Sequence, residues 1–383
     1  MVMKIMYVAS DNRLSSGAFK SMVKLCEIER DMYNVEPIVV IPTHGDGEEL
    51  LKIANLKYIY VRSEDWIISN SYESFKGFIK KRIKLALNFL AIIKLQKLMK
   101  KNEIDIVHIN TSYTYVGAVA ANKLNIPVVW HLRELLEEDQ NNRFLVKDGS
   151  KKLIYKSSKI IAISNYVYNK YKQSFLEKII EIPNGIDESL YYSLRDILLE
   201  DITRFIYVGG ISEKKGFGYI IEAMKQLIEE GIDNVHLEVL GNDKEPYGEK
   251  MKQIIQENKL SDYITFRGVC VNTHEFYKKS DVMLMTSECE AFGRTTVEAM
   301  QSGCLVIGSD SGATPDILNH GKAGILFKPR DSVDLKNKMI YVMKNKSICR
   351  KIAKDGQNRA IRKYTARENA KQIYEVYKSI LHE

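Results

Sequence analysis

Apolar residues occur along this chain in short runs separated by longer amphipathic segments. Runs such as residues 3–8 (MKIMYV) and 235–240 (VHLEVL) have strand length, whereas the segments between them carry apolar residues at helical spacing. Regular alternation of strand and helix predicts parallel sheets covered by helices, an α/β fold. The expected strands are 3–8, 37–41, 58–61, 104–109, 127–131, 159–163 and 179–182, followed by 204–208, 235–240, 263–266, 281–286, 304–308 and 324–327.

The length of the chain and one break in the pattern predict two domains. At 383 residues the chain is too long for one ordinary core. Residues 183–187 (PNGID) have turn composition and lead into a polar stretch, so they are the best linker candidate. We expect two Rossmann-like domains facing a central cleft, at residues 1–185 and 186–365.

The segment 290–303 (EAFGRTTVEAMQSG) carries the most specific chemistry. It lies between two expected strands, and Phe292-Gly293 marks the start of a helix whose N-terminal amides favour a phosphate. Glu298 would lie about 7–8 Å along that helix, roughly the reach from a diphosphate to the ribose of one nucleotide. Glu290 would lie on the other side of the phosphates. One carboxylate for ribose hydroxyls and one for a sugar indicate a nucleotide-sugar site, although glutamates also favour solvated helix ends.

On these residues the chain resembles the GT-B retaining glycosyltransferases with a Glu-x7-Glu motif (glycosyltransferase family 4-like, group 1). The resemblance runs nearly end to end and is strongest from residue 204 to residue 327. It implies that residues 366–383 form a helix packing back on the first domain. It also implies that the first domain binds the acceptor and the second binds the donor, through Phe292, Gly293, Arg294, Thr295 and Glu298, with catalysis involving Glu290.

Further site residues follow from the carboxyl ends of other expected strands, where parallel sheets place ligands. His131 ends the strand 127–131, so its imidazole should point into the cleft, and it matches the active-site histidine of the family. Lys215 matches the family lysine and would neutralise a leaving diphosphate. Arg133, two residues after His131, is either a site residue or an ion-pair partner of Glu134.

The loops after the first strand of each domain complete the predicted donor site. Ser16 and Gly17 match a family loop that reaches the donor phosphates, although a serine here could simply cap the next helix. After the strand 204–208, Gly209 and Gly210 match the phosphate loop, but many family members have an arginine where this chain has Gly210. The missing charge could come from Arg294 or Lys214. By the same resemblance, the backbone near Val269 holds the base, and uridine is the expected one.

Composition narrows the class of protein. The five cysteines have no metal-like spacing, which suits a reducing cytoplasm, and neither a signal peptide nor a spanning segment is visible. With no Asp-x-Asp pair and no histidine pair at ligand spacing, we expect neither a metal nor another cofactor. The formal net charge of +8 is local: residues 76–101 contain nine bases and no acid, so nucleic-acid binding is not expected.

That basic segment predicts contact with a membrane surface. Residues 75–90 (FKGFIKKRIKLALNFL) combine an apolar and a cationic helix face, as in helices that lie on anionic bilayers. The simpler interpretation is a solvated crossover helix, which we favour from Leu85 to Leu98, whereas we favour the membrane interpretation from Lys76 to Lys84. The predicted membrane-surface residues are Lys80, Lys81, Arg82 and Lys84.

The resemblance therefore implies an enzyme that moves a sugar from a nucleotide-diphosphate sugar, expected to be a UDP-sugar, to a hydroxyl of a glycan or lipid-linked acceptor. Retention of the anomeric configuration, a role in surface polysaccharide synthesis and a location on the inner face of the cell membrane belong to the same expectation. Two alternatives stay open: a phosphorylase or epimerase on the same fold, and a catalytically silent, membrane-docked partner of a polysaccharide assembly complex.

Overall fold

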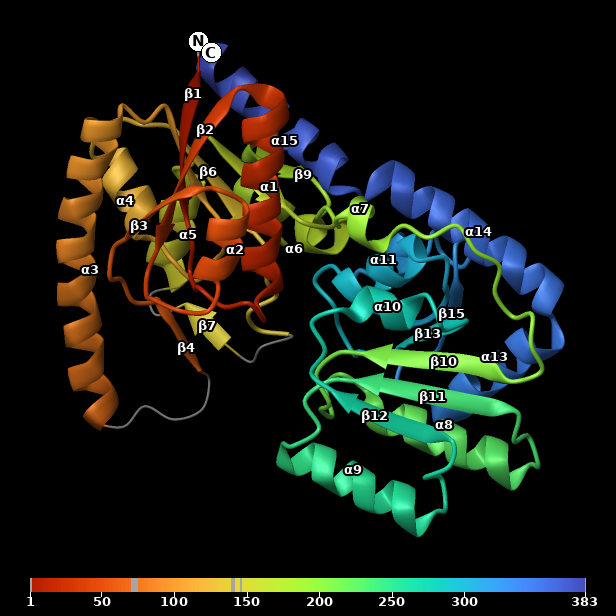
Figure 1. The fold of residues 1–383 in the computed structure, drawn as a ribbon. Helices are drawn as coiled ribbons and strands as arrows, with labels where there is room; N and C mark the ends of the chain where they lie inside the picture. Colours follow the sequence, from red (N-terminus) through yellow and green to blue (C-terminus); the bar gives the residue numbers. More distant parts are fainter. Residues whose placement is uncertain (1, 70–74, 139–141, 145–146, 383) are drawn as a thin grey trace. The chain divides into compact units, whose positions relative to one another are not determined.

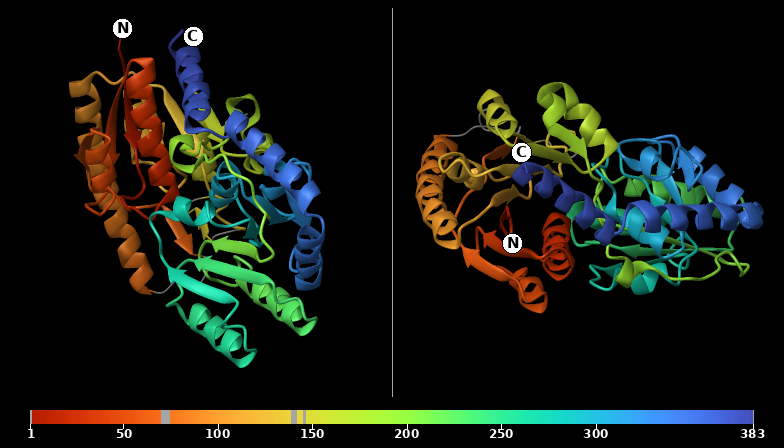
Figure 2. Two further views of the ribbon diagram at one scale, coloured as in Figure 1. Left: turned by 45° about the vertical axis from the view of Figure 1, so that its right-hand side comes forward. Right: turned by 90° about the horizontal axis from the view of Figure 1, so that it is seen from above.

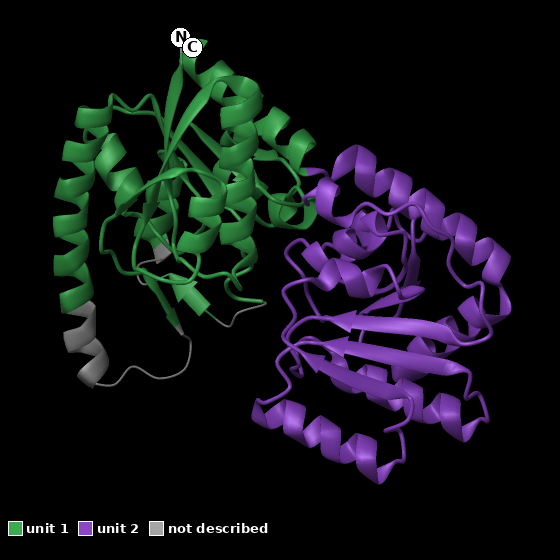
Figure 3. Ribbon diagram, viewed as in Figure 1, with its two compact units in different colours: residues 1–185, 366–383 green, residues 186–365 purple. Residues whose placement is uncertain are grey.

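The computed structural model divides the chain into two compact units. Unit 1 comprises residues 1–185 and 366–383, and unit 2 comprises residues 186–365 (Figure 3). These ranges are the ones expected for the two domains and the returning helix; the binding roles assigned to them stay predictions. The structure describes residues 2–69, 75–138, 142–144 and 147–382, and the side chains of residues 69, 75–82 and 147 are outside that description.

Unit 1 is built on a seven-stranded parallel sheet in the order β3-β2-β1-β5-β6-β8-β9 (Figure 1). Its strands are β1 (Met3–Val8), β2 (Val35–Ile41), β3 (Lys57–Tyr60), β5 (Ile106–Ile109), β6 (Val128–Leu132), β8 (Lys159–Ala162) and β9 (Ile179–Glu181). Its helices are α1 (Gly17–Tyr33), α2 (Glu48–Ile53), α3 (Phe75–Asn102), α4 (Val116–Asn122), α5 (Lys147–Tyr155), α6 (Asn165–Phe175) and α15 (Ala366–His382). A short 3₁₀ turn, Leu176–Lys178, leads into β9.

Unit 2 has a six-stranded parallel sheet in the order β12-β11-β10-β13-β14-β15. Read along the chain this is 3-2-1-4-5-6, the order of a dinucleotide-binding Rossmann fold. Its strands are β10 (Thr203–Val208), β11 (Val235–Leu240), β12 (Ile264–Gly268), β13 (Val282–Met285), β14 (Leu305–Ser309) and β15 (Ile325–Phe327). Its helices are α7 (Glu188–Tyr191), α8 (Phe217–Glu229), α9 (Pro246–Glu257), α10 (Thr273–Tyr277), α11 (Arg294–Gln301), α12 (Thr314–Ile317), α13 (Ser332–Lys344) and α14 (Lys346–Lys363).

Helices lie on both faces of each sheet (Figure 2), which explains why the strands read as nearly continuous apolar runs. In β13, for example, all four residues are buried. The core of unit 1 includes apolar residues of α15, such as Ala370 and Ile373, beside those of β1, α1 and β2. The core of unit 2 is formed separately by its own strands with α8, α9, α13 and α14.

Every strand expected from the sequence is present within two residues of its predicted bounds. Two further strands, β4 (Ile67–Ser69) and β7 (Asn142–Phe144), form an antiparallel pair outside the main sheets. Each has three residues, too few to produce a recognisable period. No helix in the described part of the chain is both long enough and apolar enough to cross a bilayer.

Candidate active site

The strand order of unit 2 reverses between β10 and β13, which lie side by side. In open α/β sheets, ligands bind at the carboxyl ends of the strands at such a reversal. The two loops that emerge there are residues 209–216, after β10, and residues 286–293, after β13. The first contains Gly209, Gly210 and Lys215, and the second contains Glu290, Phe292 and Gly293, so the fold brings these predicted site residues to one edge.

Lys215 and Glu290 are in direct contact across these loops. The Lys215 Nζ lies 2.8 Å from Glu290 Oε1, and the two side chains are 30% and 18% exposed. A cation and a carboxylate 75 positions apart are therefore placed together at the surface of the sheet edge. The lysine can attract a phosphate, and the carboxylate can accept hydrogen bonds from hydroxyl groups.

Backbone contacts hold the two loops against each other. The Glu288 N–H donates to the Lys214 carbonyl at 3.0 Å, and the Thr286 hydroxyl donates to the Lys215 carbonyl at 3.0 Å. Gly216 has a φ of +70°, and a Cβ there would overlap the Thr286 carbonyl. Only glycine suits that position, because it has neither the Cβ nor the left-handed penalty of other residues.

A third loop, after β14, supports Glu290 and was not anticipated from the sequence. The Ala313 N–H donates to the Glu290 carbonyl at 3.0 Å. A Cβ on Gly312, whose φ is +58°, would lie 2.6 Å from the Glu290 nitrogen and 2.7 Å from its carbonyl oxygen. The Ser311-Gly312 pair, two residues after the end of a buried strand, was the available signal, since such pairs mark turns.

Helix α11 begins as the sequence predicted. Gly293 is its N-cap with a φ of +85°, and Glu298 is the fifth residue of the helix. The amides of Arg294 and Thr295 belong to the first turn, where N–H groups point toward the N-terminal end of the helix. The Phe292 ring is buried and meets Tyr364 edge to face, with 5.9 Å between ring centroids. Any donor contact from Phe292 would therefore use its backbone.

Glu298 is buried beside a cation and two tyrosines. The Arg294 guanidinium lies 3.6 Å from its carboxylate, and the Tyr277 hydroxyl donates to it at 3.4 Å. The pKa values of Tyr277 and Tyr191 are both raised, first by burial and then by the negative charge of Glu298. Arg294 therefore places a positive charge beside the glutamate expected at the ribose. Neither tyrosine was predicted, because nothing in the local sequence links α7 or α10 to α11.

The remaining predicted residues of unit 2 follow the carboxyl ends of β10 and β12. The Gly209 N–H donates to the Leu240 carbonyl at 3.0 Å. A Cβ on Gly210 would meet no atom within 4 Å, so the position has room for a side chain. Val269 follows β12 and is 75% exposed.

In unit 1, Ser16 caps α1: its Oγ accepts from the Phe19 N–H at 3.2 Å and donates to Asp11 Oδ2 at 3.1 Å. The capping role that the sequence left open is thus present. Burial raises the pKa of Asp11. Gly17, the other predicted residue, is the first residue of the same helix.

His131, in β6, is fully buried, and the imidazole contacts described for it lie within unit 1. Its Nδ1 lies 3.2 Å from both His108 Nε2 and an Arg133 guanidinium nitrogen. Its Nε2 is buried and has no hydrogen-bond partner among the described residues. Burial, followed by the charge of Arg133, lowers the pKa of His131 well below its usual value.

Arg133 and Glu134 each have buried partners in unit 1, and Arg133 also lies close enough to act electrostatically on the Glu134 carboxylate. Besides His131, Arg133 donates to Asn184 and to the carbonyl and side chain of Asn110, the last two at 3.0 and 3.1 Å. Glu134 accepts from the Ser112 N–H at 2.9 Å, and burial raises its pKa to about 7.

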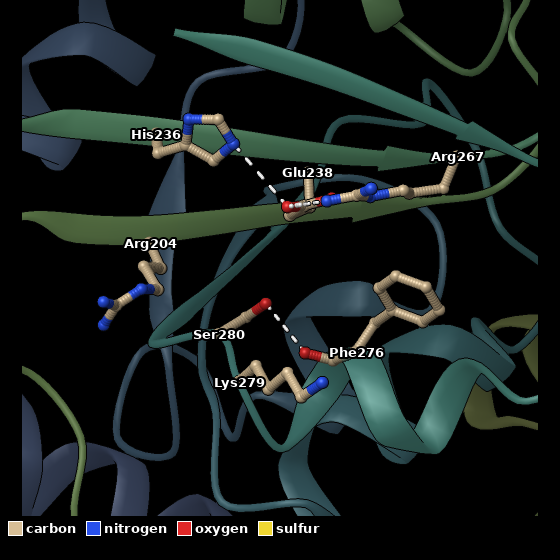
Figure 4. Close-up of a pocket in the computed structure, with 7 residues that line it drawn as sticks. All are labelled: Arg204, His236, Glu238, Arg267, Phe276, Lys279 and Ser280. Atoms are coloured by element: carbon tan, nitrogen blue, oxygen red, sulfur yellow. Dashed lines mark hydrogen bonds and ion pairs between the residues drawn. The ribbon is translucent and has the colours of Figure 1, made fainter.

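Unit 2 also has a pocket of about 380 Å³, which none of the predicted site residues lines (Figure 4). Its lining residues are Arg204, His236, Glu238, Arg267, Phe276, Lys279 and Ser280. Arg267 donates to both carboxylate oxygens of Glu238, at 2.7 and 3.0 Å, so the central charges of this pocket neutralise each other.

Two predictions are only partly covered by the described residues. Lys80, Lys81 and Arg82 have side chains outside the description; Lys84 pairs with Asp65 at 3.1 Å. Over the described residues, no group of three or more His, Cys, Asp or Glu side chains is arranged to hold a metal ion. The expectations about metal and cofactor stay predictions.

Comparison with known proteins covers both units. The profile of "Glycosyl transferases group 1" matches residues 197–359, and that of "Glycosyltransferase Family 4" matches residues 32–190. N-acetyl-alpha-D-glucosaminyl L-malate synthase of Bacillus anthracis is 22% identical over 308 residues, covering 75% of this chain and 78% of that protein. The capsular polysaccharide biosynthesis glycosyltransferase CapH of Staphylococcus aureus is 26% identical over 225 residues, covering 57% and 62%.

Among solved structures, HepE of Anabaena in complex with UDP is similar over nearly the whole chain. The TM-score is 0.81 at 20% identity, with 98% of this chain and 100% of HepE covered. At this identity the likeness establishes the fold, that of the GT-B glycosyltransferases, with two domains of parallel sheet.

Proposed function

Since the chain belongs to the group 1 and family 4 glycosyltransferases, we propose that it transfers a sugar from a nucleotide-diphosphate sugar to a hydroxyl of a glycan or lipid-linked acceptor. The observation that carries the proposal is the Lys215–Glu290 pair at the carboxyl edge of the unit 2 sheet, in loops adjoining the N-terminus of α11. It combines a cation, a carboxylate and helix amides where a diphosphate and its sugar would bind.

The reaction would proceed by departure of the diphosphate from the face that the acceptor attacks. The bond between the anomeric carbon and the phosphate oxygen breaks, and both electrons leave with the nucleoside diphosphate. Lys215 and the first-turn amides of α11 stabilise that charge. The acceptor oxygen then bonds to the anomeric carbon, and its proton passes to the departing phosphate, so the configuration is retained.

Glu290 would hold the sugar rather than attack it. Its carboxylate is paired with Lys215 at 2.8 Å, which lowers its nucleophilicity compared with an unpaired carboxylate. Hydrogen bonds from sugar hydroxyls to Glu290 would orient the donor as its anomeric carbon becomes positively charged. Front-face departure is therefore favoured over a covalent glycosyl-enzyme intermediate.

The nucleotide is proposed to be uridine diphosphate, and the product to belong to a surface polysaccharide or glycoconjugate. HepE, which shares the fold, has been crystallised with UDP, and CapH is named for capsular polysaccharide biosynthesis. Val269 and its exposed neighbour Val271 offer apolar surface beside the backbone at the end of β12, as a base would require.

The proposal is tested by donor binding and turnover. A thermal-shift screen of UDP-glucose, UDP-galactose, UDP-N-acetylglucosamine and the matching GDP-sugars would select the donor, because binding to the folded state raises Tm. Release of UDP from that donor is then measured for Lys215→Met and Glu290→Gln. Each variant should lose about 100-fold or more in kcat, the scale for removing one group that stabilises transition-state charge.

A surface ion pair of the same unit provides the control. Lys252 and Glu249 lie 3.2 Å apart on α9, and Lys252→Met and Glu249→Gln should turn over like the unaltered protein. Unchanged turnover in Lys215→Met and Glu290→Gln would contradict the proposal. Donor binding without UDP release would favour the catalytically silent partner instead.

We further propose that α3 docks on the inner face of the cell membrane. Four large apolar residues on the described part of this helix are about half exposed or more: Ile83, Leu85, Phe89 and Leu90. Their exposure extends the proposed surface past Leu85, where the sequence favoured a solvated crossover helix. They follow directly on the basic residues 80–82, and apolar groups beside bases suit an anionic bilayer.

Co-sedimentation with vesicles containing phosphatidylglycerol tests this docking. Binding should fall when Lys80, Lys81, Arg82 and Lys84 are replaced by glutamine. It should persist when the same charge is removed later in the helix, at Lys94, Lys97, Lys100 and Lys101. Equal binding by both quadruple variants would exclude the proposed surface.

A further inference from the structure

A chain of buried polar side chains crosses the core of unit 1 and ends at His131. Glu29 of α1 meets Tyr7 of β1, and the Tyr7 hydroxyl lies 2.9 Å from the Tyr377 hydroxyl of α15. The Tyr377 hydroxyl lies 2.6 Å from His108 Nδ1 on β5, and His108 Nε2 lies 3.2 Å from His131 Nδ1 on β6. All five side chains are buried. The chain thus joins the first helix and the last helix to the predicted sugar-binding histidine.

Arg133 decides which nitrogen of His131 carries the proton. A guanidinium group only donates hydrogen bonds, and one of its nitrogens lies 3.2 Å from His131 Nδ1. That Nδ1 must therefore be an acceptor, so in the neutral ring the proton is on Nε2. Arg133 itself is held in place by Asn110 and Asn184, which both accept from it.

This choice sets the direction of every bond along the chain. The single lone pair of His131 Nδ1 is then shared between the Arg133 guanidinium and the Nε2–H of His108, and the Nδ1 of His108 accepts from Tyr377. When Glu29 is ionised, the Tyr7 hydroxyl donates to its carboxylate. The direction set at His131 requires the reverse: the Tyr377 oxygen accepts from Tyr7, and the Tyr7 oxygen accepts from Glu29. Glu29 can donate only as a neutral carboxylic acid. Its other oxygen is buried with no partner among the described residues, which a neutral acid tolerates better than a carboxylate does.

The titration behaviour of these groups agrees with that direction. Burial raises the pKa of Glu29 to about 8, so the acid is largely protonated at neutral pH. Burial, with Arg133 as a second cause, lowers the pKa of His108 to about 3 and that of His131 well below its usual value. Both imidazoles are therefore neutral at physiological pH, with one proton each.

We propose that Arg133, His108 and Tyr377 are positioning residues that hold His131 as a neutral imidazole presenting its Nε2–H to the donor sugar. The inference rests on the proposed function, because it specifies how His131 would contact the sugar. It also restricts that contact. The neutral ring can donate a hydrogen bond from Nε2, but it cannot act as a general base, because its Nδ1 is occupied, or as a general acid, because it carries no extra proton. The C-terminal helix contributes to the site through Tyr377, which the sequence pattern did not indicate.

The state of the ring is tested first, without any substrate. Protein labelled with ¹⁵N-histidine should show a proton-bearing Nε2 and a bare Nδ1 for His131, with no titration from pH 6 to 8. His131→Asn assigns the resonances by removing them. Observation of the Nδ1–H form, or of titration in that range, would overturn the proposal whether or not the protein is a transferase.

Variants then test the chain that leads to the ring. Tyr377→Phe removes the donor to His108, and kcat for UDP release should fall at least about tenfold with KM for the donor nearly unchanged, since a misplaced group costs turnover. The imidazole signals of His108 should change as well. Tyr374→Phe is the matched control. It removes one hydroxyl from the same helix, and its ring stacks on Tyr33, which is not part of the hydrogen-bonded series from Glu29 to His131.

Glu29, at the end of the hydrogen-bonded series opposite His131, provides a rescue experiment. Glu29→Gln keeps a donor, its amide NH₂, toward Tyr7, whereas Glu29→Met of similar size does not. The glutamine variant should retain more turnover than the methionine variant and keep the His131 resonances of the unaltered protein. Equal losses in both, or a Tyr377→Phe protein that behaves like Tyr374→Phe, would refute the positioning role while leaving the transferase activity established.

Discussion

One buried carboxyl group in unit 1, that of Glu29, makes the stability of this protein depend on pH. Glu29 is enclosed by the core, near the ionisable side chains of Tyr7, Cys26 and Tyr377. Its pKa is about 8 in the folded protein, against an ordinary value of 4.5. Burial therefore favours the protonated form of Glu29 in the folded protein. Stability from this group is fully present below pH 4.5 and is lost as the pH rises toward 8.

Replacing Glu29 by glutamine should remove that dependence. Between pH 5 and 8 the unaltered protein should lose stability relative to Glu29→Gln, at no more than about 1.4 kcal/mol per pH unit, the limit for one proton. Urea unfolding followed by tryptophan fluorescence measures unit 1 alone, because Trp66 and Trp130 are the only tryptophans of the chain. Parallel stability curves for the two proteins would contradict the buried neutral acid.

A second residue-scale prediction concerns the glycine at position 210. Many members of the family have an arginine where this chain has Gly210, and a side chain there would meet no atom within 4 Å of its Cβ. Gly210→Arg should therefore fold normally and add a positive charge at the phosphate loop. We expect UDP to bind several-fold more tightly, as measured by calorimetry. Gly210→Gln, with a long but uncharged side chain, is the control. Equal affinity in both would mean that the charge is already supplied, with Arg294 and Lys214 as the candidates.

At the scale of elements, close contacts between loops position the Glu290 carboxylate. The loop after β14 packs its Gly312 against the backbone of Glu290, and the loop after β10 packs its Gly216 against Thr286. These contacts tie three strand ends into one rigid edge. Lys215 and Glu290 thus meet before any ligand binds, so less ordering is needed when the donor arrives.

Gly312→Ala tests this arrangement. It should destabilise unit 2 by about 1–3 kcal/mol beyond the cost of a left-handed alanine, because its Cβ would press on Glu290. Gly231→Ala is the matched control, since Gly231 also has a positive φ, +76°, but no atom within 4 Å of the added Cβ. Amide exchange of β13 and β14 measures the stability, and UDP release should fall in the Gly312 variant alone. Equal effects of the two substitutions would mean that backbone strain, and not contact with Glu290, determines the outcome.

At the scale of the whole molecule, the two units should differ in their ability to fold as separate fragments, because one is a continuous segment and the other is not. Unit 2 is one continuous segment with its own core, so residues 186–365 should fold alone. Unit 1 needs the end of the chain, because Ala370, Ile373 and Tyr377 are fully buried in its core. Residues 1–185 should therefore be unstable until a peptide of residues 366–383 is added.

Circular dichroism of the separate fragments checks this expectation. The 186–365 fragment should melt cooperatively and bind UDP, whereas the 1–185 fragment should gain a cooperative transition only with the peptide. A peptide with Tyr377→Ala is the control and should restore much less. Cooperative folding of residues 1–185 without any peptide would show that α15 is an accessory element.

The sequence alone determined the strands of the two parallel sheets, but not the short pair β4 and β7, and it determined the main carboxylate motif, because these depend on local pattern. A buried parallel strand must be continuously apolar, and a helix start needs a residue such as Gly293 directly before its periodic segment. The tertiary structure alone decided which distant residues meet: Lys215 with Glu290, Gly312 with the Glu290 backbone, and Tyr377 with His108. Such contacts depend on the order of strands in a sheet and on the return of the last helix to the first unit, and neither leaves a mark in the local pattern of the chain.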